Sequence, residues 1–323
     1  MNTKIVFLDR ETADIGDIDF TGIESLGQVE YFKNTTEPSQ IHERIADATI
    51  VITNKVYIDG AAMDAAGQLQ AIQVAATGVN NVDLDAAKQR RIKVFNVSGY
   101  SAPAVAQHVF AVLLNLVTHV HRYAAAPEKW PESPFFTRLD YPISELMGKT
   151  FGIVGYGDIG KSVATIARAF GMNVVAMARD NSSKSDSGDD AIERMAIDKF
   201  FASCDVISLH CPLTDENYHM INSETLGAMK PTAILINTGR GDLVNEADLL
   251  AALSNGNIGA AALDVISEEP PPTDHPVICA NLPNLFITPH SAWSSVESRQ
   301  RLFDGIVENL KAMQNGEERN RVV

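Results

Sequence analysis

The stretch FGIVGYGDIG, residues 151–160, decides the fold of this chain. An apolar run typical of a β-strand leads into Gly155, Gly157 and Gly160, which have the G-x-G-x-x-G spacing, and a helix-like segment follows. In this context the first glycine permits a tight turn, the second lets the backbone approach a pyrophosphate, and the third allows close helix–strand packing. The pattern predicts a dinucleotide-binding unit, with the N–H groups of the helix N-terminus facing the anion. A glycine-rich loop without a ligand is the plainer alternative.

The composition indicates a soluble globular protein. The 323 residues are 45% hydrophobic and 21% charged, which suits two α/β domains, each with its own core. The formal net charge of −15 argues against nucleic acid or an anionic membrane as a partner. We expect no membrane span and no signal peptide. The three cysteines have neither a disulfide-framework pattern nor a zinc-site spacing, so we expect no metal and a cytoplasmic location.

Short apolar segments alternate with helix-length segments along most of the chain, which predicts parallel, doubly wound sheets. The expected strands of the first hundred residues are 4–9, 29–32, 49–54, 71–76 and 93–97, and six later ones are TFGIVGYG, NVVAMAR, DVISLH, AILINTGR, GAALDV and LFITPH. A long, almost wholly apolar helix over 101–123 is expected to be buried between domains or subunits. An amphipathic helix is expected over about 294–313.

Polar residues follow several of the later strands directly. They are His210–Cys211–Pro212, Asn237–Thr238–Gly239–Arg240, Asp264, and Thr288–Pro289–His290. In an open parallel sheet, ligands bind outside the carboxyl ends of the strands. We therefore expect these residues to share one site with the glycine-rich turn.

Three residues in this region have the chemistry that reduction of a keto acid requires. A cation must hold the substrate carboxylate, a proton donor must serve the developing alkoxide, and a carboxylate must orient that donor and keep it protonated near neutrality. The candidates are Arg240, His290 and Glu269. Each has a plainer interpretation: a surface charge, a structural histidine, and an exposed turn before three prolines.

At these positions the sequence resembles the D-isomer-specific 2-hydroxyacid dehydrogenase family, and most of all its glycerate dehydrogenase/hydroxypyruvate reductase group. The matching stretches run in family order over nearly the whole chain. They are ITNKV (52–56), AATGVNNVDL (75–84), NVSGYSAPAVAQH (96–108), GKTFGIVGYGDIG (148–160), SLHCPLT (208–214), MKPTAILINTGRGDLVNE (229–246), ALDVISEEPPP (262–272) and NLFITPHSAW (284–293). The resemblance implies reversible reduction of a small anionic 2-keto acid, hydroxypyruvate or glyoxylate first, to the D-2-hydroxy acid by NAD(P)H.

The resemblance also assigns roles to individual residues. Arg240, Glu269 and His290 would be catalytic. Coenzyme contacts would come from Val105, Gly155, Gly157, Asp158, Ile159, Gly160, Arg179, His210, Cys211, Pro212, Thr238, Gly239, Asp264 and His290, with Asp264 near the nicotinamide carboxamide. Substrate contacts would come from Asn54, Thr77, Gly78, Val79, Arg240 and His290.

The family architecture implies two doubly wound α/β domains. A Rossmann-type nucleotide domain at 104–291 would be inserted into a flavodoxin-like substrate domain at 1–103, which residues 292–323 complete. The helix region 101–123 would contribute to a homodimer interface. The alternative is a core helix within one chain.

The strand GMNVVAMARD, residues 171–180, departs from the NAD pattern of the family. The acid that grips the ribose hydroxyls would fall at Ala178. Loss of that carboxylate, with Arg179 beside it and further donors at Ser182, Ser183 and Lys184, favours NADPH over NADH. Asp180 reaching the ribose, or Arg179 acting only as a lid on the adenine, is the alternative.

Two other functions fit parts of the same pattern. A dinucleotide-sensing binding protein or corepressor on this scaffold would keep the fold and have little turnover. The intact set of Arg240, Glu269 and His290 speaks against it. A formate dehydrogenase is a third possibility, but that branch of the family carries an amide before the histidine instead of the carboxylate of Glu269.

Overall fold

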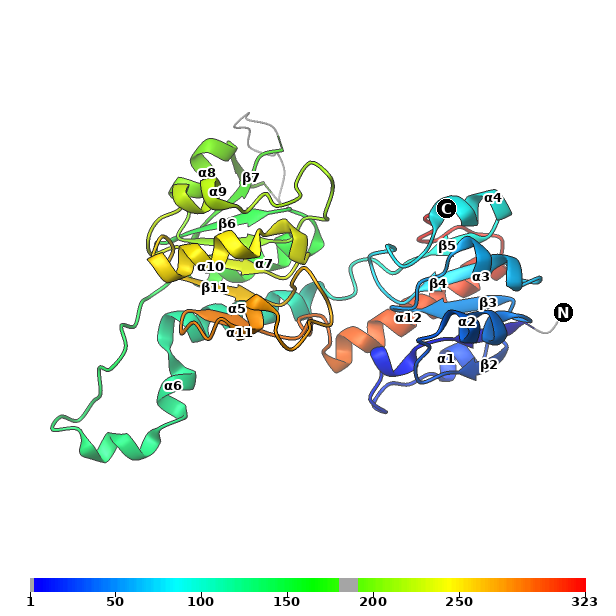
Figure 1. Ribbon diagram of the computed structural model, residues 1–323, viewed down its shortest axis with the longest axis horizontal. Coiled ribbons are helices and arrows are strands. Elements are labelled where there is room, and N and C mark those ends of the chain that lie inside the picture. Colours follow the sequence, from blue (N-terminus) through cyan, green and yellow to red (C-terminus); the bar gives the residue numbers. More distant parts are fainter. Residues whose placement is uncertain (1–2, 180–190) are drawn as a thin grey trace. The chain divides into compact units, whose positions relative to one another are not determined.

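The computed structural model describes residues 3–179 and 191–323 and divides into two compact units (Figure 1). Unit 1 comprises Met1–Ser101 and Trp293–Val323, and unit 2 comprises Ala102–Ala292. The chain therefore passes from one unit to the other twice, at 101–102 and at 292–293. Each unit has its own sheet.

Unit 1 contains a parallel five-stranded sheet over its described residues, in the order β2-β1-β3-β4-β5. The strands are β1 (Lys4–Phe7), β2 (Gln28–Tyr31), β3 (Ile50–Thr53), β4 (Ala71–Val74) and β5 (Lys93–Phe95). The central strands β3 and β4 are buried at every residue, because helices cover both faces of the sheet. This order is that of the flavodoxin-like folds.

The helices of unit 1 fall into two layers. One core cluster contains side chains of α2 (Pro38–Ile45), α3 (Gly60–Ala65) and α4 (Leu84–Arg90). The other contains Leu302, Phe303, Ile306 and Leu310 of α12 (Val296–Gln314), together with Ile23 of the short helix α1 (Thr21–Glu24). The C-terminal helix thus returns to cover one face of the first sheet. A 3-10 turn, η1 (Arg10–Thr12), follows β1.

Unit 2 contains a parallel seven-stranded sheet over its described residues, in the order β12-β11-β10-β9-β6-β7-β8. The strands are β6 (Thr150–Val154), β7 (Asn173–Met177), β8 (Glu193–Met195), β9 (Val206–Leu209), β10 (Ile234–Asn237), β11 (Ala260–Leu263) and β12 (Leu285–Ile287). Numbered within the unit, the first six strands run 3-2-1-4-5-6, the order of the Rossmann fold, with the reversal between β6 and β9.

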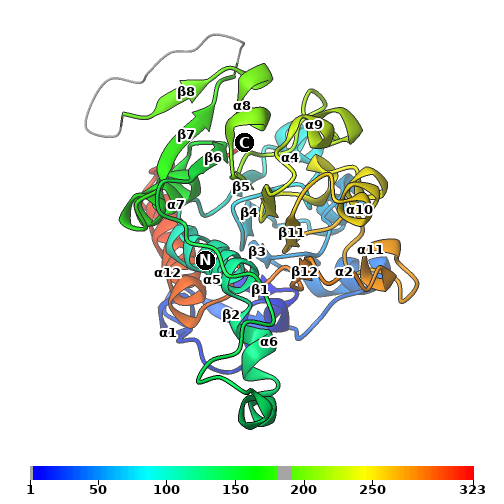
Figure 2. The same ribbon diagram turned by 90° about the vertical axis from the view of Figure 1, so that its left-hand side faces the viewer.

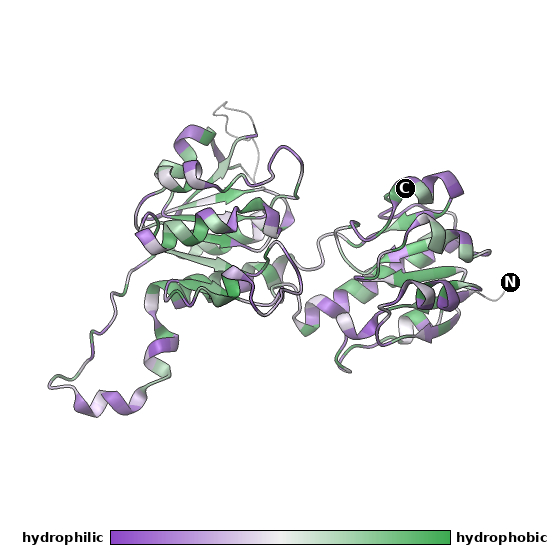
Figure 3. Ribbon diagram, in the orientation of Figure 1, coloured by the Kyte–Doolittle hydropathy of each residue, from purple (hydrophilic) through white to green (hydrophobic). Residues whose placement is uncertain are grey.

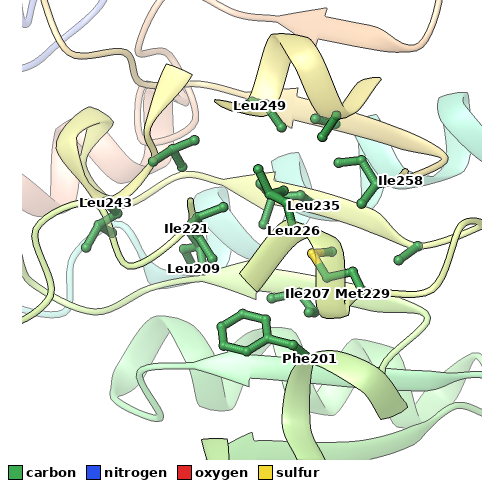
Figure 4. Packing of buried hydrophobic residues seen from close by; sticks show 14 of the residues in the cluster. Phe201, Ile207, Leu209, Ile221, Leu226, Met229, Leu235, Leu243, Leu249 and Ile258 are labelled. Atoms are coloured by element: carbon green, nitrogen blue, oxygen red, sulfur yellow. The ribbon is translucent and has the colours of Figure 1, made fainter. Parts of the chain in front are cut away.

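The helical elements of unit 2 lie between these strands and before the first of them. They are α5 (Ala102–Thr118), α6 (Val120–Ala124), η2 (Pro127–Glu132), α7 (Asp158–Ala169), α8 (Ile197–Ser203), α9 (Ser223–Ala228), η3 (Gly241–Leu243), α10 (Glu246–Asn255) and α11 (Pro276–Cys279). The strands and α5 are the most hydrophobic parts of the unit (Figure 3). Figure 4 shows one core cluster, in which Leu209, Leu235 and Phe201 pack with residues of α9 and α10.

Two elements differ from the sequence-based expectation. The strand β8 lies parallel to β7 at the edge of the sheet, where no strand was expected (Figure 2). The helix expected over 101–123 is two helices, because His119 adopts a left-handed conformation (φ 51°) between α5 and α6. In the described residues no helix combines the length and the hydropathy needed to cross a membrane.

Candidate active site

The predicted polar residues of unit 2 all follow the carboxyl ends of neighbouring parallel strands. Strands β6, β9, β10, β11 and β12 end at Val154, Leu209, Asn237, Leu263 and Ile287. In the ladders, Val154 pairs with Leu209, Leu209 with Asn237, Asn237 with Leu263, and Leu263 with Ile287. The turn and the candidate residues therefore share one edge of the sheet.

The glycine-rich turn packs directly against the end of β9. Gly155 has φ +96°, and a Cβ there would lie 2.6 Å from the backbone nitrogen of Cys211 and 2.7 Å from the carbonyl carbon of His210. A Cβ on Gly160 would overlap the carbonyl oxygen of Gly155. Both positions therefore require glycine for close backbone packing.

Gly157 differs from the other two glycines, because a Cβ there would meet no atom within 4 Å. Gly157 is the N-cap of α7, and no side chain caps that end of the helix, whose first turn begins with Asp158 and Ile159. The N-terminus of a twelve-residue helix thus opens onto space at the sheet edge. This arrangement fits a pyrophosphate.

Ala178 and Arg179 follow β7, the next strand beyond β6. The methyl group of Ala178 is buried (2% exposed), and its N–H donates to the carbonyl oxygen of Met195 in β8 at 2.9 Å. Arg179 is exposed. Asp180, Ser182, Ser183 and Lys184 lie outside the described residues. The position expected for a ribose-binding acid therefore carries a buried methyl group.

His210 connects the ends of β9 and β10. Its Nε2 lies 2.9 Å from Ser208 Oγ, and its Nδ1 lies 3.2 Å from Thr238 Oγ1. Burial lowers the pKa of His210 to about 3, so the imidazole is neutral near pH 7. Burial also raises the pKa of the neighbouring Cys211 thiol. Pro212, next along the chain, is exposed and its carbonyl accepts from Asn217 Nδ2 at 2.8 Å.

Asn237, at the end of β10, fixes the loop that carries Arg240. Its buried amide donates to the carbonyl oxygen of Arg240 at 2.8 Å and accepts from the N–H of Gly239 at 3.0 Å. The guanidinium Nη1 donates to the carbonyl of Gly239 at 2.7 Å. Gly241 packs so closely on Ile266 that a Cβ there would overlap the Ile266 backbone. The Arg240 loop is thus in contact with the segment that follows β11.

That same segment positions Glu269 beside His290. Glu269 Oε1 accepts from the N–H of Ile266 at 3.1 Å, and Oε2 lies 2.5 Å from His290 Nδ1. The two side chains are about one-third exposed, 30% for His290 and 32% for Glu269. The structure thus brings the predicted proton donor and its carboxylate into contact. The loop that carries Arg240 contacts the same segment, because Gly241 packs against the backbone of Ile266.

Asp264 is buried, and one of its neighbours, His108, was not predicted for the site. Its carboxylate accepts from Thr288 Oγ1 at 2.6 Å, and Thr288 Oγ1 lies 3.1 Å from Nε2 of His108 in α5. Val105, on the same helix, is buried. His108 ends the family-like stretch NVSGYSAPAVAQH (96–108), but nothing in the sequence assigned it a role in the site.

The predicted substrate residues lie in unit 1, at the carboxyl edge of its sheet. Asn54 directly follows β3 and is buried, and its N–H donates to Asp9 Oδ1 at 2.9 Å. Thr77, Gly78 and Val79 follow β4, the neighbouring strand, and Thr77 Oγ1 donates to the carbonyl of Val97 at 3.0 Å. Within residues 3–179 and 191–323, no group of three or more His, Cys, Asp or Glu side chains is arranged to hold a metal ion.

The chain is similar in sequence and in fold to known dehydrogenases. Residues 110–292 match the family described as D-isomer specific 2-hydroxyacid dehydrogenase, NAD binding domain. The chain is 39% identical to the hydroxypyruvate reductase of Blautia hydrogenotrophica over 97% of each chain. It is 40% identical to the glycerate dehydrogenase of Methylorubrum extorquens, over 100% of this chain and 99% of the other. The crystal structure of D-lactate dehydrogenase from Aquifex aeolicus with NAD and lactic acid superposes with a TM-score of 0.80, at 28% identity, over 97% and 96% of the two chains.

Proposed function

Because the chain belongs to the D-isomer specific 2-hydroxyacid dehydrogenase family, we propose that it reduces hydroxypyruvate to D-glycerate, with glyoxylate as a second substrate. The chain is an oxidoreductase of this family and uses a nicotinamide dinucleotide. The observation that carries the proposal is the contact of His290 with Glu269 on the sheet edge that also holds the glycine-rich turn.

When bound, the coenzyme would supply a hydride to the carbonyl carbon of the substrate. His290 donates a proton to the carbonyl oxygen, so that one hydride and one proton convert the ketone to an alcohol. Glu269 faces Nδ1 of the ring, so Nε2 would be the atom that donates the proton to the substrate. Arg240 holds the carboxylate and polarises the carbonyl through its planar fork of donors.

We assign coenzyme binding to residues of unit 2 and further substrate contacts to residues of unit 1. The turn of Gly155, Gly157 and Gly160 would hold the pyrophosphate. The backbone N–H groups around Thr77–Val79 would help hold the substrate carboxylate, and Asn54 would line the substrate pocket. Tyr100 and Trp293, whose rings meet edge to face with centroids 6.3 Å apart in unit 1, are candidates for its wall.

Initial rates with hydroxypyruvate, glyoxylate, pyruvate and 2-oxoglutarate test the proposed substrate. We expect the highest kcat/KM with hydroxypyruvate. A preference for pyruvate or 2-oxoglutarate would contradict the substrate but not the reaction. Tight coenzyme binding without turnover of any keto acid would favour a dinucleotide sensor.

We further propose that NADPH is preferred over NADH. A carboxylate after β7 would repel a 2′-phosphate, and here that position is the buried methyl group of Ala178, with the exposed cation of Arg179 next to it. The variant Arg179→Ala should raise the KM for NADPH about 10-fold and leave that for NADH nearly unchanged. An equal effect on both coenzymes would mean that Arg179 does not bind the phosphate.

We also propose a homodimer that buries the region after α5. Large apolar side chains are concentrated and exposed over 120–147: Val120, Trp130, Phe135, Phe136, Leu139, Ile143 and Met147. The same segment is held in shape by its own hydrogen bonds, such as those from Trp130 Nε1 to the carbonyl of Phe136 and from the N–H of Tyr141 to Tyr123 Oη. An ordered segment with exposed aromatic rings needs a partner surface.

A suitable surface is present on the same unit. A groove of about 660 Å³ between α5 and α7 is lined mainly by apolar residues, among them Phe110, Leu114 and Phe170. In a dimer with a twofold axis, the 120–147 segment of each copy would pack into this groove of the other copy. Sedimentation should give twice the chain mass of 35.0 kDa, and Phe136→Asp should weaken the dimer. The control Ile15→Asp, at an exposed residue of unit 1, should not. A monomeric wild-type protein would refute the proposal.

A further inference from the structure

The backbone of His290 has an unusual conformation. Its φ is +51°, in the left-handed region that residues other than glycine rarely adopt. Such a conformation persists only where the surrounding bonds determine it, and it is often found at functional sites. The N–H of His290 donates to the carbonyl oxygens of Asp264 at 2.8 Å and Thr288 at 3.0 Å. Asp264 and Thr288 therefore hold the backbone that sets the direction of the imidazole.

The carboxylate of Asp264 binds the loop on both sides of His290. Oδ1 accepts from the hydroxyl of Thr288, two residues before it, at 2.6 Å, and from the N–H of Ser291, directly after it, at 2.9 Å. Oδ2 accepts from the N–H of Ala292 at 2.9 Å. Asp264 is only 3% exposed, so these bonds are shielded from water.

His108 completes this set of bonds from a different element. The single hydroxyl proton of Thr288 is donated to the carboxylate, so its oxygen accepts from His108 Nε2, 3.1 Å away. His108 Nε2 therefore carries a hydrogen, and it also lies 3.7 Å from Asp264 Oδ1. The side chain of His108 is 18% exposed. The chain of bonds runs from α5 through Thr288 to Asp264 and the His290 backbone.

We propose that His108 and Thr288 are positioning residues that keep His290 in its left-handed conformation and aimed at the substrate. The proposal rests on the role of His290 as proton donor. Without the Thr288 hydroxyl, Asp264 loses a donor and His108 loses an acceptor. The loop then relaxes toward an ordinary backbone conformation, and the imidazole turns from its place beside Glu269.

The test compares Thr288→Val, which removes the hydroxyl at similar size, with Thr288→Ser, which keeps it. Thr288→Val should lower kcat about 10- to 100-fold, the usual effect of losing a partner that orients a reactive group. Coenzyme Kd and substrate KM should change by less than about 3-fold, since neither residue is assigned to binding. Thr288→Ser should stay within about 3-fold of wild type in kcat, because it restores the donor and the acceptor.

The variant His108→Ala and the double variant show whether the two residues act together. His108→Ala should also lower kcat, and adding it to Thr288→Val should cost little more, because both remove the same chain of bonds. The proposal would be overturned by a folded Thr288→Val enzyme with wild-type kcat. It would also be overturned by an equal loss of kcat in the Ser and Val variants, or by additive effects of His108→Ala and Thr288→Val on kcat. A main effect on coenzyme Kd would do the same.

If Thr288→Val does not fold, the kcat of His108→Ala decides, and a wild-type value overturns the proposal. These outcomes are distinct from failure of the proposed function. If the proposed function fails, the wild-type protein itself will reduce no keto acid.

Discussion

Replacing Glu269 with Gln removes the charge next to His290 while keeping the shape of the side chain. The two carboxylate oxygens are used separately, one 2.5 Å from His290 Nδ1 and the other accepting from the N–H of Ile266 at 3.1 Å. Glutamine has one acceptor oxygen and one NH2 group. Whichever way the amide turns, it keeps one of these bonds and places its NH2 group against a donor at the other position.

The expected loss follows from the strength of the bond and its exposure. A hydrogen bond to a charged group contributes about 1.5–3 kcal/mol. Because both side chains are about one-third exposed, at 30% and 32%, we take the lower half of that range. About 1.5–2 kcal/mol corresponds to a loss of about 10- to 30-fold in kcat/KM.

The assay follows coenzyme oxidation by its absorbance and coenzyme affinity by fluorescence titration. Glu268→Gln is the matched control, because Glu268 is the exposed neighbour on the same loop. We expect the Glu269→Gln loss in kcat with nearly unchanged coenzyme Kd, and wild-type behaviour for the control. A Glu269→Gln enzyme within about 2-fold of wild type would refute the idea that this carboxylate orients the proton donor.

The remaining predictions concern other parts of the chain. Arg240→Ala should lower kcat/KM at least about 100-fold while coenzyme Kd, measured by calorimetry, stays nearly constant; equal loss of both would contradict its role. Gly160→Ala should lower both Tm and coenzyme affinity, because the new Cβ overlaps a carbonyl oxygen of the turn. Gly157→Ala should leave Tm unchanged and weaken coenzyme binding alone, because its Cβ points into open space. Hydrogen bonds from Arg299 lower the pKa of Asp17, so this pair stabilises the fold above about pH 4 and the effect is lost as pH falls through the lowered pKa; acid unfolding of Asp17→Asn should lack that component.

The strand ends of unit 2 could be predicted because the signal is local. Each buried parallel strand is a short apolar run, and the polar residue after it must lie at the common edge whatever the rest of the chain does. Asn237, Asp264 and His290 all follow this rule. The contact of Glu269 with His290 depends on the path of the loop that follows β11. The residue types suggested the two roles, and the structure brings the two side chains together.

Other features depend on contacts between distant segments. His108 and Thr288 are 180 residues apart, and no local pattern relates them. The strand β8 is only three residues long, Glu-Arg-Met, and pairs because β7 offers an edge. The break at His119 occurs at a histidine in the left-handed region, where the usual signal would be glycine.

The most direct test of the central claim is the product formed from hydroxypyruvate, measured by chiral chromatography beside the amount of coenzyme oxidised. We predict D-glycerate in a one-to-one ratio with oxidised coenzyme, and loss of both in His290→Gln. Formation of L-glycerate, or a protein that binds coenzyme and forms no hydroxy acid from any 2-keto acid, would contradict the account.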